Sequence, residues 1–255
     1  MGLTADGAPA ATRPPPRPRP EWRPALLVAD RRENDVTRTL VLRVPGWSGH
    51  LPGQHVDVRL TADDGYQASR SYSIAAPADG ERVELTVQRV ADGEVSPYLV
   101  DDLPVGAAIE ILGPVGGWFV WRPAAEPPSL LVAGGAGIVP IMAMVRAWRD
   151  GGGPGSLRLL YSLRSRDLLC YAAELSALDD GLLLAYTRRA PPGSARPPGR
   201  LTPAEVAEYG VPPDRAPRCY VCGPTGFVEA MSALLTGMGH DPARIRTERF
   251  GPSGG

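Results

Sequence analysis

The chain has 255 residues, of which 43% are hydrophobic and 22% charged, and its formal net charge is −1 at pH 7. This is the composition of a globular protein, and so small a net charge gives no general attraction to nucleic acid, which is therefore not an expected partner. No apolar run approaches the about 18 residues of a membrane span, and no secretory signal opens the chain, so a cytoplasmic protein is expected.

Residues 1–21 are rich in alanine, proline and arginine, and we expect them to form a disordered tail. Residues 22–122 show mostly two-residue alternation of apolar positions, as in VDVRL (56–60) and VELTVQRV (83–90). Turn sequences divide this segment into five or six short strands, which predicts an antiparallel β-barrel or sandwich. One short helix is expected inside it from Ser96 to Asp102, with Ser96 as the N-cap and Pro97 at the first helical position.

The proline-rich segment 123–128 is expected to link two domains. From residue 129 to 250 apolar strands alternate with helical patterns, which predicts a doubly wound parallel sheet covered by helices on both faces. Thr202 and Glu205 have the spacing of a capping box at a helix start. Residues 251–255 are expected to be a C-terminal tail. The expected strands are SLLVAGG (129–135), LRLLYS (157–162), LLLAYT (182–187), CYVCG (219–223) and RIRTERF (244–250).

The cysteines give no sign of a metal or disulfide site. Cys170, Cys219 and Cys222 are an odd number, which favours a reducing compartment over a disulfide framework. Cys219 and Cys222 have CxxC spacing, but they lie on an expected strand, where residues i and i+3 point to opposite faces. Three thiolates do not complete an iron–sulfur cluster, and the histidines lack zinc spacing, so no metal is expected.

Three motifs in the first domain are typical of a site for a flavin dinucleotide. The run Arg70-Ser71-Tyr72-Ser73 supplies a cation and an aromatic ring, and Gly93-Glu-Val-Ser96 is a turn into a helix N-terminus that favours an anion. The turn 113–119 (GPVGGWF) carries two adjacent aromatic side chains. Each motif alone is also compatible with an ordinary strand or turn.

Two glycine turns mark the second domain. Gly134-Gly-Ala-Gly-Ile-Val-Pro140 lies between an expected strand and helix, where the pyrophosphate of a dinucleotide sits in doubly wound folds. Cys222-Gly-Pro-Thr-Gly226 follows another strand of the same sheet. Because the carboxyl ends of parallel strands share one edge, both turns are expected to line one crevice.

The motifs R-x-Y-S, G-x-V-S, G-P-x-G-x-F/W, G-G-x-G-x-x-P, C-G-P and E-x-F follow one another in this order from Arg70 to Phe250, and the resemblance that they carry covers roughly residues 22–250. In this the chain resembles the ferredoxin–NADP⁺ reductase superfamily, and is most similar to compact bacterial reductases and the reductase halves of oxygenase systems. The resemblance implies an FAD-binding barrel, an NAD(P)-binding domain, and hydride transfer between NADPH and the flavin.

The resemblance also implies residue roles. Ser73 would hydrogen-bond near the hydride-accepting flavin atom, Cys222 would lie beside the nicotinamide without acting as a nucleophile, and Glu248 would lie near the flavin. Phe250 would cover the flavin where the nicotinamide docks, unless it is simply a core residue. The implied FAD contacts are Arg70, Ser71, Tyr72, Ser73, Gly93, Val95, Ser96, Trp118 and Phe250. The implied contacts to the nicotinamide dinucleotide are Gly134, Gly135, Gly137, Gly223 and Pro224.

Basic and hydroxyl side chains follow the second and third strands of the second domain. Arg164, Arg166, Thr187 and Arg188 suit a ribose 2′-phosphate, which favours NADP(H) over NAD(H) unless these arginines are only solvated surface groups. Ala136 stands where the family commonly has threonine, so one hydroxyl contact to the dinucleotide is missing.

No cysteine-rich ferredoxin domain lies within the 255 residues, so we expect a monomer that passes single electrons to a separate carrier such as ferredoxin. Two alternatives remain open at this stage. In the first, the chain is a reductase subunit held in a larger oxidoreductase. In the second, it is a flavin-binding module without catalysis.

Overall fold

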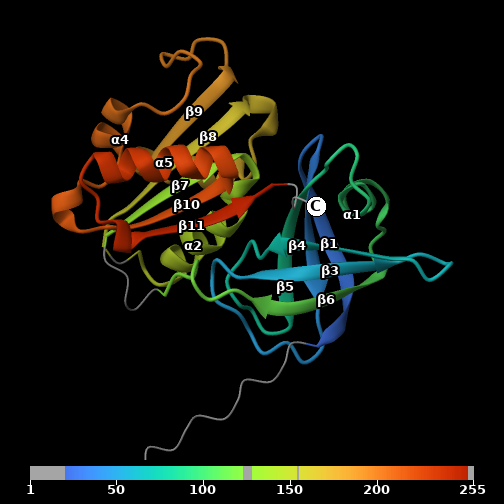
Figure 1. Ribbon diagram of the computed structural model, residues 1–255. Coiled ribbons are helices and arrows are strands. Elements are labelled where there is room, and N and C mark those ends of the chain that lie inside the picture. The colour runs from blue at the N-terminus through green and yellow to red at the C-terminus, as the bar shows by residue number, and fades with distance from the viewer. Residues whose placement is uncertain (1–20, 123–127, 154, 252–255) are drawn as a thin grey trace, which may run out of the picture.

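The computed structural model describes residues 21–122, 128–153 and 155–251. The chain forms two units, an antiparallel barrel-like sheet and a parallel sheet covered by helices, which confirms the predicted fold class (Figure 1). Nearly all of the expected N-terminal tail and of the expected linker, and most of the expected C-terminal tail, lie outside the described residues. Within the described residues, no helix combines the length and apolar character needed to cross a membrane.

The first unit is a six-stranded sheet in the order β4-β3-β6-β1-β2-β5, with neighbouring strands antiparallel. Alternate residues point inward, so Leu27, Leu40, Leu85 and Ile111 are fully buried in one core. The pairing of β3 with β4 sets Val56 opposite Tyr72 and His55 opposite Ser73. The strands are β1 (Trp22–Asn34), β2 (Thr37–Arg43), β3 (His55–Thr61), β4 (Gln67–Ser73), β5 (Arg82–Gln88) and β6 (Ala108–Val115).

The short helix in the first unit differs from its prediction. α1 (Val95–Pro97) begins one residue early and continues as a π-helical turn, Tyr98–Asp102, and the Ser96 side chain does not cap it. The Ser96 hydroxyl instead accepts a hydrogen bond from the Val90 amide at 3.0 Å, which closes the preceding loop. The far end is held by buried Arg38, which donates to the carbonyl oxygens of Leu99 (3.2 Å) and Leu103 (2.9 Å). Arg38 is far from this segment in sequence, so a local pattern does not indicate these hydrogen bonds at its end.

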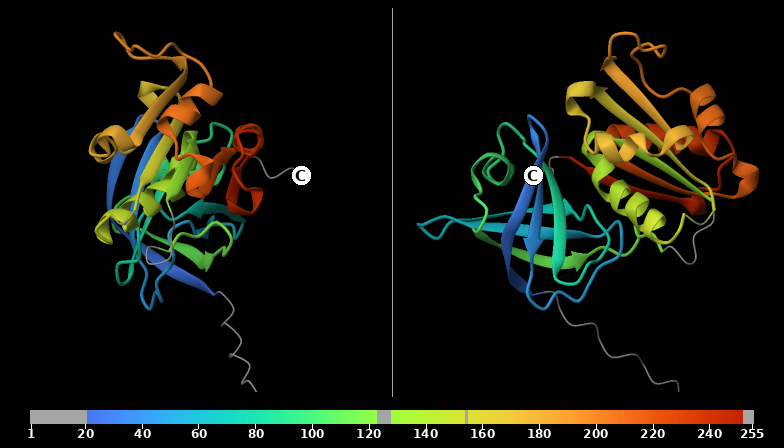
Figure 2. Two further views of the ribbon diagram at one scale, coloured as in Figure 1. Left: turned by 90° about the vertical axis from the view of Figure 1, so that its left-hand side faces the viewer. Right: turned by 180° about the vertical axis from the view of Figure 1, so that it is seen from behind.

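The second unit is a five-stranded parallel sheet in the order β11-β10-β7-β8-β9. Residues of α2 and α3 are buried against one face and those of α4 and α5 against the other, as Figure 2 also shows. Cys219 and Cys222 lie in the clusters on opposite faces, as the alternation predicted. The strands are β7 (Ser129–Gly134), β8 (Leu157–Ser165), β9 (Leu182–Arg189), β10 (Arg218–Pro224) and β11 (Ile245–Phe250), and the helices are α2 (Ile138–Asp150), α3 (Ala172–Ser176), α4 (Pro203–Tyr209) and α5 (Thr225–Gly237).

The predicted capping box starts α4. The Thr202 side chain accepts from the Glu205 amide, and the Glu205 carboxylate accepts from the Thr202 amide at 2.9 Å. The preceding helix α3 is short and ends at Ser176.

Arg146 of α2 joins the two units. Its guanidinium donates to Glu84 of β5 (3.1 Å), to the Ala75 carbonyl (2.9 Å) and, within its own unit, to Glu174 (2.6 Å). Beside it, buried Tyr171 donates its hydroxyl to Thr86 of β5 at 2.6 Å. The segment immediately after Ser73 is therefore tied to the second unit by charged and neutral hydrogen bonds.

Candidate functional site

Ser73, Cys222 and Glu248 come together where the two units meet. Ser73 ends β4 and is buried, and its hydroxyl donates to the Glu248 carboxylate of β11 at 3.4 Å. Cys222 of β10 stands beside Glu248 in the register of the parallel strands. Residues separated by about 150 and 175 positions in sequence are thus assembled at the carboxyl ends of two strands, where doubly wound folds bind their ligands.

The surroundings raise the pKa of both the Glu248 carboxyl and the Cys222 thiol. Burial raises the pKa of Glu248 to about 7, although the hydrogen bond from Ser73 pulls it down. Burial, together with the charge of Glu248, raises the pKa of the Cys222 thiol well above its ordinary value. Cys222 is therefore a thiol rather than a thiolate, as suits a shaping contact and not a nucleophile.

The Glu248 carboxyl should make stability depend on pH. Its folded-state pKa lies above the ordinary 4.5, so the folded chain holds a proton that the unfolded chain has lost, and stability falls as pH rises from about 4.5 through 7. We expect Glu248→Gln to remove this decline, measured as unfolding midpoints across that range. Glu229→Gln, at a 60% exposed carboxylate of α5, controls for the loss of a charge. Parallel pH profiles for the wild type and Glu248→Gln would contradict the assignment.

β4 carries the predicted flavin-binding residues on its two faces. Tyr72 packs against the barrel core, and burial raises the pKa of its phenol to about 12. The exposed Arg70 guanidinium lies 3.4 Å from the Glu94 carboxylate and also donates to the Ser69 carbonyl at 2.7 Å. Ser71 points to the other face and donates to Asp57 of β3. Tyr72 and Arg70 therefore share the face that Ser71 does not.

The remaining predicted barrel residues have mixed settings. Val95 is buried in the barrel core, Ser96 closes the loop described above, and a side chain at Gly93 would press on Ser96 at 3.1 Å. Trp118 is 61% exposed, and the Arg246 guanidinium lies 5.4 Å from its ring centre. Its neighbour Phe119 is buried edge-on against Tyr220, so Phe119 belongs to the contact between the units.

The two predicted glycine turns touch one another. A Cβ at Gly137 would lie 2.2 Å from the Cys222 carbonyl oxygen, and one at Gly134 would lie 2.6 Å from the Phe227 ring. Gly223 is packed against the same ring and against Gly134. Gly135 differs, because it has a φ of +54° and open space where a side chain would be. Close packing thus requires glycine at three positions, while Gly135 leaves its backbone open to a ligand.

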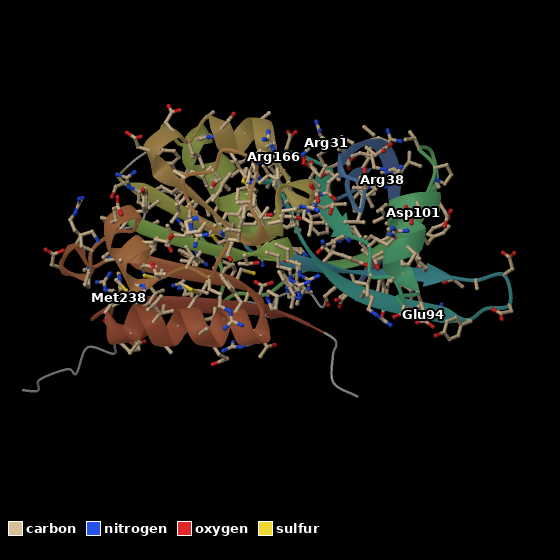
Figure 3. All side chains as sticks on the ribbon, turned by 90° about the horizontal axis from the view of Figure 1, so that it is seen from above. Arg31, Arg38, Glu94, Asp101, Arg166 and Met238 are labelled. Atoms are coloured by element: carbon tan, nitrogen blue, oxygen red, sulfur yellow. The ribbon has the colours of Figure 1, made fainter. Side chains whose placement is uncertain are left out.

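The residues predicted for the ribose phosphate lie at the carboxyl ends of β8 and β9, with Arg166 directly after β8. Thr187 donates to the Leu163 carbonyl at 3.3 Å, which ties the two strands together. Arg164 and Arg188 are exposed, and Figure 3 shows Arg166 on the side of the second unit that faces the barrel. Within the described parts of the chain, these three arginines form no ion pair. They are therefore open to a phosphate.

Phe250 ends β11 opposite Pro224 of β10. Its ring is half-buried and packs against the core cluster that contains α2 and Cys222. This position is compatible with both interpretations of Phe250 given above, a ring over the flavin or a residue closing the core.

Sequence reasoning missed several polar residues around the site. Glu94 lies inside the quoted GEVS motif, yet its pairing with Arg70 was not anticipated. Asp167 follows β8 and forms an ion pair with Arg189, because β8 extends to Ser165 rather than Ser162. Arg146 gave no signal in an apolar helical pattern, and only its long-range partners reveal its role.

Comparison with known families settles the relationship. An oxidoreductase FAD-binding domain model matches residues 25–120, and an oxidoreductase NAD-binding domain model matches residues 131–233. The chain belongs to the ferredoxin–NADP⁺ reductase superfamily. Its domain content is that of an FAD-dependent NAD(P)H oxidoreductase, in which FAD and a pyridine nucleotide are the cofactors.

Relatives within this superfamily are mostly longer. The chain is 31% identical over 207 residues to a flavohemoprotein of Pseudomonas putida, covering 79% of this chain and 51% of the relative. It is 31% identical over 211 residues to the ferredoxin–NAD(P)⁺ reductase component of naphthalene 1,2-dioxygenase/salicylate 5-hydroxylase systems of a Ralstonia species, covering 80% and 61%. The chain thus spans between half and about three-fifths of the length of these two relatives.

A solved structure matches the whole arrangement. The FAD/NAD-binding domain of nitric oxide dioxygenase from Vibrio cholerae superposes with a TM-score of 0.79 at 26% identity, covering 90% of this chain and 99% of that one. An Amycolatopsis cytochrome P450 reductase gives a TM-score of 0.78, also at 26% identity, covering 92% and 71%. Both domains and their relative placement therefore match those of these two solved structures.

Proposed function

We propose that this chain takes hydride from NADPH onto bound FAD and passes the electrons singly to a separate redox protein. The observation that carries the proposal is the meeting of Ser73 from the FAD domain with Glu248 and Cys222 from the nucleotide domain. A hydroxyl, a protonatable carboxyl and a neutral thiol at the junction of two cofactor domains suit hydride transfer between those cofactors. FAD itself would supply the conversion of a two-electron step into one-electron steps.

The residues present fit both cofactors. Along β4, an exposed arginine and an aromatic ring share one face, which suits a pyrophosphate and an isoalloxazine ring. The Glu248 carboxyl is partly buried, and among the described residues its one hydrogen bond is the long contact from Ser73. Such a group accepts a further donor readily. The interlocked glycine turns and open Gly135 suit the dinucleotide.

Flavin reduction tests the proposal directly. We expect the purified protein to take up one FAD per chain and to bleach near the flavin absorption band when NADPH is added without oxygen. Protein that binds no FAD would overturn the proposal. Protein that binds FAD but is reduced by neither NADPH nor NADH would favour the alternative of a flavin-binding module without catalysis.

NADPH selection is expected to depend on Arg188. Arg188→Ala should lower kcat/KM for NADPH roughly 10- to 150-fold, because a charge-assisted contact to the 2′-phosphate worth about 1.5–3 kcal/mol is lost. kcat/KM for NADH, which lacks that phosphate, should change little. Arg189→Ala is the matched comparison, since Asp167 already engages the Arg189 guanidinium. Equal losses with both nucleotides would assign Arg188 a structural role.

The acceptor is proposed to be a protein of an oxygenase system. Relatives include a glycine betaine monooxygenase reductase subunit of Pseudomonas aeruginosa and a 3-ketosteroid-9-alpha-monooxygenase ferredoxin reductase component of Rhodococcus rhodochrous. Purification from the native cell distinguishes a free reductase, which elutes as a monomer, from a subunit that elutes with its oxidoreductase partner.

A further inference from the structure

One face of β4 presents four side chains in a row. Tyr66 extends the strand, because its carbonyl accepts from the Ala62 amide at 2.9 Å and so continues the ladder between β3 and β4. Side chains alternate along a strand, which sets Tyr66, Ala68, Arg70 and Tyr72 on the same face. Ala68 and Tyr72 both pack against the barrel core, as this alternation requires. With about 3.3 Å per residue, the row extends roughly 20 Å.

The Tyr66 ring is exposed but held in place. It is 58% exposed, and its hydroxyl donates to one Glu94 carboxylate oxygen at 3.0 Å. The other oxygen of the same carboxylate lies 3.4 Å from the Arg70 guanidinium. Glu94 thus holds the Tyr66 ring near Arg70, the residue predicted to bind the pyrophosphate. Only the small Ala68 side chain lies between Tyr66 and Arg70 on that face. Among the residues that the structure describes, Tyr66 belongs to none of the three hydrophobic core clusters.

The row runs away from the nucleotide domain. Ser73, at one end of β4, meets Glu248, while the hairpin between β3 and β4 projects from the opposite side of the barrel (Figure 1). Figure 3 shows Glu94 on that side of the barrel, remote from the nucleotide domain. A ligand whose reactive ring lies at Tyr72 therefore extends along β4 toward Tyr66.

We propose that Tyr66 is the platform on which the adenine of FAD stacks, so that Tyr72, Arg70 and Tyr66 hold the isoalloxazine ring, pyrophosphate and adenosine in order. This inference rests on the proposed FAD function and deepens it. An aromatic ring binds an adenine face, and immobilisation of that ring by Glu94 lowers the entropy lost on stacking. FMN lacks the adenosine, so Tyr66 selects FAD over FMN.

Flavin affinities test the inference without any turnover. Flavin-free protein is titrated with FAD and with FMN, following the quenching of flavin fluorescence. Tyr66→Ala should weaken FAD binding by about 5- to 150-fold, the range for removing one stacking ring, and leave FMN binding unchanged. Tyr66→Phe keeps the ring and should retain most of the FAD affinity. Tyr209→Ala, at an exposed tyrosine of α4, is the control and should change neither affinity.

Each other outcome has a distinct meaning. Unchanged FAD affinity in Tyr66→Ala overturns the assignment, including the case where only electron transfer to a protein acceptor slows and Tyr66 belongs to a docking surface. Equal weakening of FAD and FMN also overturns it, because Tyr66 would then shape the barrel generally. Failure of the wild-type protein to bind FAD overturns both this inference and the proposed function, whereas the other outcomes leave the function standing.

Discussion

Replacing Ser73 with alanine should leave FAD bound but slow its reduction by NADPH on the order of 100-fold. The Ser73 hydroxyl is 5% exposed and is aimed at the junction of the two domains, where it donates to Glu248. A pre-oriented donor in a site with little water stabilises developing charge much more than a solvated donor does. Its loss should therefore act on the rate constant for hydride transfer, measured by stopped-flow bleaching, rather than on flavin affinity.

Ser69→Ala is the matched control for Ser73→Ala. Ser69 lies on the same strand, points to the same face as Ser73, and is exposed. An unchanged rate in Ser73→Ala would remove the hydroxyl from the chemistry. A loss of bound FAD in Ser73→Ala, with a normal rate for the remaining holoprotein, would instead assign Ser73 to cofactor binding.

Replacing Arg146 with alanine should destabilise the chain by about 3–5 kcal/mol, the range for removing one partner of a buried ion pair. Burial alone would lower the pKa of Arg146, but the hydrogen bond with Glu174 and the charge of Glu84 raise it overall. Arg146 and Glu84 are only 14% and 11% exposed, so Arg146→Ala leaves a poorly hydrated carboxylate between the domains. A lower unfolding midpoint, with the two domains melting separately, is the expected calorimetric result.

Arg31→Ala tests whether location rather than charge matters. Arg31 also pairs with Glu84, but its side chain is 43% exposed, so its loss should cost only about 0–1 kcal/mol. Equal destabilisation by both variants would mean that any positive charge near Glu84 suffices. A single unshifted transition in Arg146→Ala would show that the other contacts between the domains, including the Tyr171–Thr86 hydrogen bond, hold them together without Arg146.

Local signals predicted the elements that depend on neighbours in sequence. The Thr202–Glu205 capping box is made by residues three apart, and the alternation of Cys219 and Cys222 follows from strand geometry. The Ser96 cap prediction was wrong because the Ser96 hydroxyl accepts from the Val90 amide instead, and Arg38, 58 positions earlier, donates to carbonyl oxygens at the far end of that segment. A loop amide that engages the serine hydroxyl, or an arginine from a distant strand, leaves no mark in the local helix pattern.

The candidate site divides in the same way. Ser73, Cys222 and Glu248 were identified through a resemblance to a family, and the structure brings them together. The contacts of Glu94 with Arg70 and Tyr66 have no fixed spacing in sequence. The same is true of the hydrogen bonds from Arg146 to the barrel. They depend on how a hairpin folds over a loop and how two domains dock, which a sequence motif does not encode.

Ser73 lies two residues before Ala75, whose carbonyl accepts a hydrogen bond from Arg146 of the other domain. This position limits which domains can be combined in a chimaeric reductase. A chimaera that joins this barrel to a foreign nucleotide domain would bring its own carboxyl-bearing last strand to meet Ser73. Only a foreign domain with a cation at the position of Arg146 would also bind Glu84 and the Ala75 carbonyl. We therefore expect coenzyme preference to be transferred with the nucleotide domain only when that domain also carries this arginine.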